Sequence, residues 1–136
     1  MKQTGLDFMK ATYAQQLSEA PQDLGQPQPP LELPLPPGAT LIPLPEPRAP
    51  GLPGMDLREA IERRRTGRRY SEESLNLAEL SSLLWLTQGV KEITNRPVTL
   101  RTVPSAGARH AFETLLLINR VDGVAPGLYR FAASQH

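Results

Sequence analysis

Residues 55–70 read Met-Asp-Leu-Arg-Glu-Ala-Ile-Glu-Arg-Arg-Arg-Thr-Gly-Arg-Arg-Tyr, with six arginines against three acids, a local charge of +3 in a chain of net charge +1. The cations are densest in Arg64–Tyr70, beside one threonine and one glycine. Guanidinium forks bind phosphate oxygens bidentately, so the pattern suits a phosphate dianion. A solvated basic helix end, or a patch for nucleic acid or a membrane surface, is the alternative interpretation.

The first part of this stretch predicts a helix. Asp56 can cap its N-terminus, and Glu59 three residues later completes a capping-box pattern. We expect Gly67 to end the helix in a left-handed turn, which would leave Arg64 and Arg65 in its last turn. The apolar side of this helix would be formed by Leu57, Ala60 and Ile61.

A second helix is expected to begin near Asn76, which has Glu79 three residues later, and to end at Gly89. Its predicted apolar face is made of leucines, together with Thr87. Trp85 is expected to pack in the core or at a subunit interface, in preference to forming a substrate platform.

Beyond the second helix we expect irregular structure over residues 90–110. Thr114–Arg120 is rich in leucine and isoleucine and predicts a buried strand, and Leu128–Phe131 predicts a second short strand. Asp122-Gly123 and Pro126-Gly127 indicate turns. The order helix, helix, strand, strand lacks repeated βαβ units, so the predicted fold class is α+β.

Toward the N-terminus, residues 5–17 could form a short amphipathic helix. Pro21–Pro53 holds 12 of the chain's 15 prolines and predicts polyproline II or irregular coil. Because leucines recur through it, we expect an extended arm that lies on a folded surface, with a ligand for aromatic-lined grooves as the alternative. The predicted organisation is an N-terminal helix and arm over residues 1–54 and a folded region over residues 55–136.

Composition narrows the class of protein. The chain has 136 residues and no cysteine, which excludes disulfides and thiolate metal sites. Its content of 39% hydrophobic residues indicates a soluble chain. The longest aliphatic run, Leu115–Ile118, is too short to span a membrane. No signal-peptide pattern is visible, so a cytoplasmic location is expected. The near-neutral charge argues against a dedicated nucleic-acid binder.

A second candidate site follows the second helix, at Arg101-Thr-Val-Pro-Ser-Ala-Gly-Ala108. After Pro104 come small residues, which allow a flat ring to approach the backbone, and Ser105 could hydrogen-bond its edge. An ordinary turn is the alternative, with Arg109 and His110 as rim residues. No protein nucleophile, acid–base pair or histidine-based metal site is recognisable, so any enzymatic chemistry would come from a cofactor, and we assign no catalytic residue and no metal ligand.

Taken in order, these segments resemble the nitroreductase family of flavin enzymes, and within it the SagB-type dehydrogenase branch. The family motif Arg-Arg-Ser-x-Arg-x-Tyr/Phe is matched by Arg64, Arg65, Thr66, Arg68 and Tyr70, with threonine in place of serine. Further matches are the leucine-rich helix over 80–90, the Arg101–Ala108 element, the Pro126–Phe131 hairpin and the proline-rich lead-in around 29–33 and 41–45.

The resemblance implies a nitroreductase-like fold, an FMN cofactor with NAD(P)H as a possible electron donor, a homodimer with FMN at its interface, and a small-molecule or peptide substrate. It implies that the FMN phosphate and ribityl chain are held by Arg64, Arg65, Thr66 and Arg68. The isoalloxazine would be lined by Pro104, Ser105, Ala106 and Gly107. No nucleic acid or membrane partner is implied.

The sequence departs from the family pattern at two positions. Ala108 replaces an asparagine that touches the flavin in some relatives, and Ala111 replaces a proline. The family domain also continues well beyond Phe131, so we expect this chain to correspond to its N-terminal portion. A peptide azoline dehydrogenase, and a non-catalytic fragment or proline-rich interaction protein, are the alternative functions.

Overall fold

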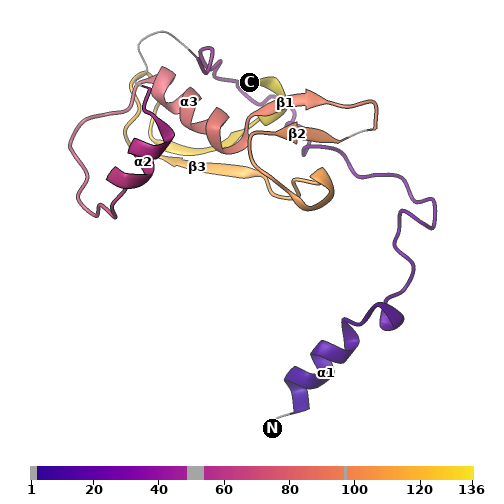
Figure 1. Ribbon diagram of the computed structural model, residues 1–136. Coiled ribbons are helices and arrows are strands. Elements are labelled where there is room, and N and C mark those ends of the chain that lie inside the picture. The colour runs from indigo at the N-terminus through magenta and orange to yellow at the C-terminus, as the bar shows by residue number, and fades with distance from the viewer. Residues whose placement is uncertain (1–2, 49–53, 97) are drawn as a thin grey trace. The chain divides into compact units, whose positions relative to one another are not determined.

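The computed structural model describes residues 3–48, 54–96 and 98–136 (Figure 1). The chain divides into two compact units, Met1–Pro30 and Leu31–His136. The predicted division, with an N-terminal helix and arm over residues 1–54 and a folded region over residues 55–136, stays a prediction.

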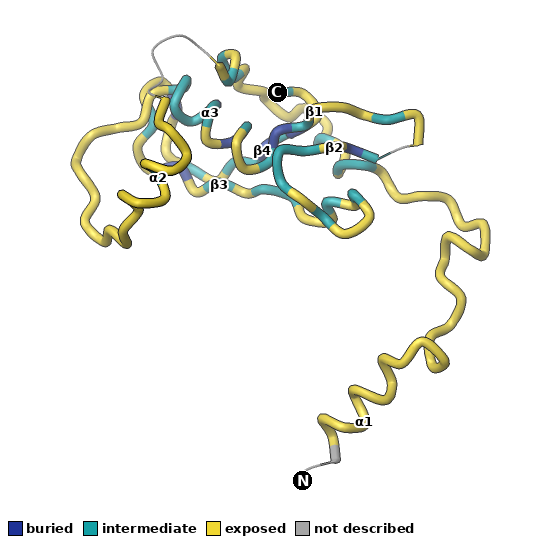
Figure 2. The backbone as a smooth tube through the Cα atoms, in the orientation of Figure 1, coloured by how far each residue is buried: buried dark blue, intermediate teal, exposed yellow. Residues whose placement is uncertain are grey.

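Over its described residues, 3–30, the first unit contains one α-helix, α1 (Gln3–Ala11), and one 3₁₀ turn, η1 (Ala14–Gln16). The helix therefore ends earlier than the 5–17 range predicted. Its apolar side chains, such as Leu6 and Met9, are exposed, and Figure 2 shows residues 4–30 exposed throughout. The amphipathic pattern predicted an apolar face of this helix, and in the structure that face is exposed.

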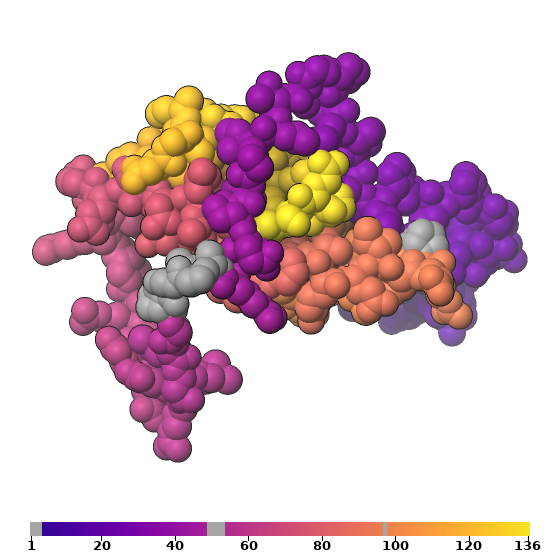
Figure 3. All heavy atoms as spheres, turned by 90° about the horizontal axis from the view of Figure 1, so that it is seen from above, coloured from indigo at the N-terminus to yellow at the C-terminus, as the bar shows by residue number. Residues whose placement is uncertain are grey.

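Residues 31–45 of the proline-rich segment belong to the second unit and contact the rest of it; we call them the strap. Among described residues 21–48 there is no helix or strand, and the final residues of the predicted segment, 49–53, lie outside the description. The Glu32 carboxylate accepts from the Ala133 amide at 2.6 Å, and the Leu33 amide donates to Glu113 at 2.7 Å. The strap crosses beside the C-terminal residues and α3 (Figure 3).

Two α-helices, α2 (Leu57–Arg63) and α3 (Leu77–Gln88), begin where their caps predict. The Asn76 side chain accepts from the Glu79 amide while the Glu79 carboxylate accepts from the Asn76 amide, both at 2.9 Å. This is a complete capping box, and Gly89 is the C-cap as predicted.

Residues 90–110 are not irregular throughout, and that prediction was wrong. β1 (Val90–Ile93) and β2 (Thr99–Arg101) form an antiparallel hairpin with a register shift between Val90 and Glu92. Most of its residues are exposed, so no buried alternation marks these short strands in the sequence. A 3₁₀ turn, η2 (Ala106–Ala108), follows.

The second hairpin pairs β3 (Thr114–Ile118) with β4 (Gly127–Phe131) in regular antiparallel register, from Thr114 opposite Phe131 to Ile118 opposite Gly127. A last 3₁₀ turn, η3 (Ala133–Gln135), follows β4. Both predicted strands and the α+β class are confirmed. The fold is compatible with part of a nitroreductase-like domain.

The core lies between α3 and the inner face of the β3–β4 hairpin. Leu84, Phe131 and Ala133 are its buried centre, with Leu80 and Leu116 packed against them. The predicted buried strand is buried on this face alone. On the outer face Leu115, Leu117 and Leu128 are 62%, 74% and 71% exposed.

Candidate phosphate-binding site

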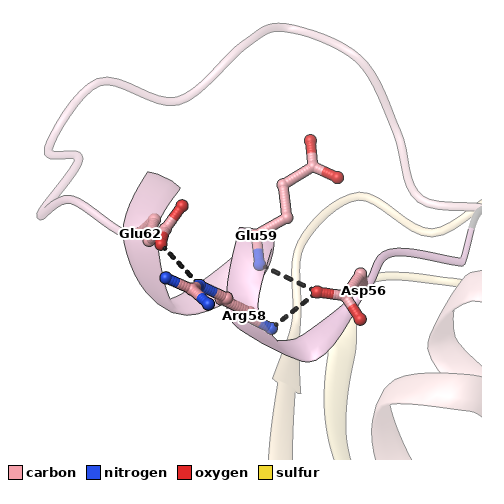
Figure 4. Close-up of polar contacts among 4 residues, drawn as sticks. All are labelled: Asp56, Arg58, Glu59 and Glu62. Atoms are coloured by element: carbon pink, nitrogen blue, oxygen red, sulfur yellow. Dashed lines mark hydrogen bonds and ion pairs between the residues drawn. The ribbon is translucent and has the colours of Figure 1, made fainter.

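Helix α2 neutralises its own arginines. The Arg58 guanidinium pairs with Glu62 at 3.0 Å, and that of Arg63 pairs with Glu59 at 2.8 Å, each one turn apart on the helix. Asp56 caps the helix, its side chain accepting from the amides of Arg58 at 2.9 Å and Glu59 at 3.2 Å (Figure 4). All three acids that the sequence places among the arginines are therefore engaged within the helix.

The remaining cations follow α2 in an exposed segment. We call Arg64, Arg65, Thr66, Arg68 and Arg69 the arginine cluster; all five are exposed. The helix ends at Arg63 with Arg64 as its C-cap, and Gly67 does not take a positive φ, so the prediction of a left-handed stop at Gly67 was wrong.

The early end of α2 has a physical cause. A longer helix would stack further guanidinium groups on its last turns, where like charges repel. The apolar side chains that could compensate are not buried, since Leu57 is 74% and Ile61 67% exposed. With no packing to sustain it, the helix stops after its paired charges.

No arginine of the cluster forms an ion pair with any residue that the structure describes. Arg120, by comparison, is satisfied by the Glu72 carboxylate and the Ser71 carbonyl, both at 2.9 Å. The cluster is therefore a local excess of uncompensated guanidinium groups, the chemistry that a phosphate group recognises.

The second predicted segment is a tight bend built on small residues. The Ser105 hydroxyl oxygen accepts from the His110 amide at 2.9 Å, which closes the bend over η2. Gly107 and Ala108 both take the left-handed conformation, with φ of 60° and 53°, and His110 does so at 42°. Pro104, Ala106 and Gly107 are exposed, so the bend presents backbone and small side chains to its surroundings.

The end of α3 holds the segment that leads into this bend. The Thr102 amide donates to the Gly89 carbonyl at 2.9 Å, and the Thr102 hydroxyl donates to the Trp85 carbonyl at 2.8 Å. Partial burial, with a contribution from the Arg101 charge, lowers the pKa of His110. A neutral imidazole beside the bend follows from these surroundings.

The predicted site residues do not line the apolar cavity of the second unit. That cavity, of about 270 Å³, lies between the strap, α3 and the β3–β4 hairpin, and neither the arginine cluster nor Pro104–Gly107 contributes to its walls. Among the described residues no group of three or more His, Cys, Asp or Glu side chains could hold a metal ion. No helix in the described ranges is long and apolar enough to cross a membrane.

No pattern in the sequence predicted a buried polar contact between Ser81, Pro45 and His136. The Ser81 hydroxyl contacts the Pro45 carbonyl at 2.5 Å and Nε2 of His136 at 2.7 Å, and Ser81 is fully buried. No local pattern indicates this contact, because its three residues come from distant parts of the chain. Trp85 packs edge-on against the His136 ring with centroids 5.7 Å apart, in agreement with a packing role.

Comparison with known proteins gives limited but specific similarity. No protein-family model matches the sequence. Over 87 residues, 64% of this chain, it is 32% identical to a protein of Methanocaldococcus jannaschii named "putative nitroreductase". The match spans 42% of that relative, so the chain covers less than half of its length. The similarity supports the nitroreductase family and an oxidoreductase class.

Proposed function

We propose that this chain is part of a flavin-dependent oxidoreductase of the nitroreductase family and that it binds FMN. The observation that carries the proposal is the arginine cluster. Its guanidinium groups have no acid partner in the described structure, whereas the neighbouring arginines of α2 are paired within the helix. Together with Tyr70, the cluster also matches the family's Arg-Arg-Ser-x-Arg-x-Tyr/Phe pattern, with threonine in third place.

Each proposed residue has a role that its chemistry allows. Arg64, Arg65 and Arg68 would bind the FMN phosphate through charge-assisted hydrogen bonds, with the Thr66 hydroxyl as a further donor. The bend over Pro104–Gly107 would lie against the flavin rings, because its small side chains allow close approach. When bound, FMN supplies hydride and electron transfer, while the protein supplies binding and orientation.

We extend the proposal to a homodimer with FMN at its interface. Its support is that the arginine cluster is exposed, as are Pro104, Ala106 and Gly107 of the bend, which is expected of residues completed by a second subunit. The finer assignment, a SagB-type dehydrogenase using NAD(P)H as donor, rests on the resemblance of Arg101–Ala108 and Pro126–Phe131 to that branch. A peptide azoline dehydrogenase, in which substrate reduces the flavin, is the alternative within the class.

The test compares FMN with riboflavin, which lacks the phosphate. Binding of each to the full chain is measured by quenching of flavin fluorescence. If the cluster recognises phosphate, FMN binds at least roughly tenfold more tightly than riboflavin, as expected for one or more charge-assisted hydrogen bonds. Equal affinities would remove the cluster from the site.

Variants assign the effect to particular residues. Arg64→Ala and Arg68→Ala should each weaken FMN binding by about 1.5–3 kcal/mol, with little effect on riboflavin. Arg58→Ala is the matched control, because Arg58 is paired with Glu62 on α2 and is expected to leave both affinities unchanged. A loss of FMN affinity equal in all three variants would point to bulk charge alone.

The second candidate function is a non-catalytic, proline-rich interaction protein. The observation in its favour is the strap, which carries leucines that remain exposed, such as Leu33 and Leu41. A colourless purified chain that neither FMN nor riboflavin stabilises against thermal unfolding would favour this candidate over the first.

A further inference from the structure

We propose that the second unit binds a small neutral aromatic molecule in the apolar cavity beneath the strap. The proposal does not depend on flavin binding, because the cavity is lined by neither segment of the candidate phosphate site. Its walls come from Thr40–Leu44 of the strap, from Leu80 and Leu84 of α3, from Leu116 and Ile118 of β3, and from Phe131.

The size of the cavity sets the size of the ligand. Its volume is about 270 Å³. An apolar cavity of about 150 Å³ lined by leucine, isoleucine and phenylalanine stays dry and takes up benzene. By that scale the cavity beneath the strap has room for a molecule of roughly ten non-hydrogen atoms.

The polar groups around the cavity favour a neutral ligand. The Tyr129 hydroxyl donates to the Ala125 carbonyl at 2.7 Å, so its donor is already used. Arg130 is the charged residue among those that line the cavity, and its guanidinium donates to the Pro34 carbonyl at 3.2 Å. A cation would lose its hydration inside the cavity without gaining a partner of opposite charge, and an anion would have to compete with the Pro34 carbonyl for Arg130.

The rings in the walls favour an aromatic ligand over an aliphatic one. Phe131 and His136 both line the cavity and meet edge-to-face, with centroids 5.3 Å apart. Tyr129 adds a third flat surface from the same strand. Aromatic rings prefer such offset and edge-on arrangements, which a planar ligand can extend.

The strap provides a route of entry. It is held at its ends by Glu32 on Ala133 and by the Pro45 carbonyl on Ser81, with no backbone ladder among the strap residues between them. Leu41 and Ile42 line the cavity and yet remain 54% and 39% exposed, so the cavity reaches the surface at this point. A small displacement of the middle of the strap would admit a ligand.

Indole is a suitable neutral probe of this size. Titrated into the full chain labelled at its methyl groups, it should give saturable NMR shifts at Leu84, Leu116 and Ile118. The outer-face methyls of Leu115, Leu117 and Leu128 should not shift. Shifts confined to the outer face, or no saturable shift at all, would overturn the proposal.

Two matched variants separate the cavity from the outer face. Leu116→Phe fills the cavity and should weaken indole binding by roughly tenfold or more, whereas Leu115→Phe places the same side chain on the exposed face and should leave it unchanged. Equal effects of the two variants would contradict the proposal. If Leu116→Phe does not fold by circular dichroism, Leu44→Phe on the strap replaces it.

The neutral character of the ligand has its own test. Indole-2-carboxylate adds a negative charge to the same ring system and should bind at least roughly tenfold more weakly than indole. Tighter binding of the carboxylate would show that the cavity selects anions, and equal binding would show that it does not select a neutral ligand; either result would make the proposed class of ligand wrong.

Discussion

Ser81 and His136 are 55 positions apart in the sequence, and their side chains meet at 2.7 Å, from Oγ to Nε2. The Ser81 hydroxyl donates its proton to the Pro45 carbonyl at 2.5 Å, so Nε2 must carry a hydrogen and donate to Ser81. Nδ1 is buried and without a hydrogen-bond partner in the described structure. The contact joins α3, the strap and the C-terminal turn, and the burial of His136 favours its neutral imidazole.

Stability should therefore depend on the protonation of His136. Burial lowers the pKa of His136, against smaller opposing effects of the Glu46 charge and of the Pro45 backbone carbonyl. The unfolded chain then binds the proton more readily than the folded chain, so the free energy of unfolding falls as the pH drops below the ordinary histidine value of about 6.5. Urea unfolding at pH 5 and pH 8 measures the difference.

The control for this prediction is the chain's other histidine. The pKa of His110 is also lowered, so His110→Asn and His136→Asn are compared with the unsubstituted chain. The pH dependence should diminish with His136→Asn, because this substitution removes the imidazole that burial keeps from protonating. A pH dependence that survives His136→Asn in full would contradict the assignment.

Loss of the α3 cap should reduce stability. Asn76→Ala removes the side chain that accepts from the Glu79 amide and should lower the free energy of unfolding by about 1 kcal/mol. Asp56→Ala removes the corresponding cap of α2, which has no buried residue, and should change global stability far less. Chemical denaturation followed by circular dichroism checks both, and equal losses would mean that α2 contributes to the core after all.

The anchor of the strap should also contribute. The Glu32 carboxylate accepts from the amides of Ala133 and Ser134 and from the Ser134 hydroxyl. Glu32→Ala leaves the Ala133 amide, on a buried residue, without its acceptor, which should cost about 1–3 kcal/mol. Glu92→Ala on exposed β1 is the control and should be neutral. A neutral Glu32→Ala would show that the strap is not held at this end.

Position 89 has no room for a side chain, because its backbone lies against Trp85 of α3. A Cβ at this position would lie 2.5 Å from the Trp85 ring and 2.6 Å from the Trp85 carbonyl, so Gly89→Ala should destabilise the protein by about 1–3 kcal/mol. Gly67→Ala is the matched control, because a Cβ there meets nothing within 4 Å and the backbone needs no positive φ. Thermal unfolding that ranks the two variants in the opposite order would contradict the packing at Gly89.

The sequence indicates the two segments of the candidate site separately, but not whether they meet. The arginine cluster is visible in the sequence because its residues are consecutive, and the small-residue bend is visible for the same reason. Whether the two meet around one ligand is a property of the assembled protein, and it stays a prediction that the FMN and riboflavin comparison addresses.

By itself, the sequence determined the elements whose signals are local. The caps at Asp56 and Asn76 set the helix starts, and the leucine-rich run set β3, because each depends on neighbours within a few residues. The tertiary structure decided the β1–β2 hairpin and the early end of α2 at Arg63. It also decided the contact of Ser81 with His136, since these features depend on packing, or its absence, between residues that no local pattern connects.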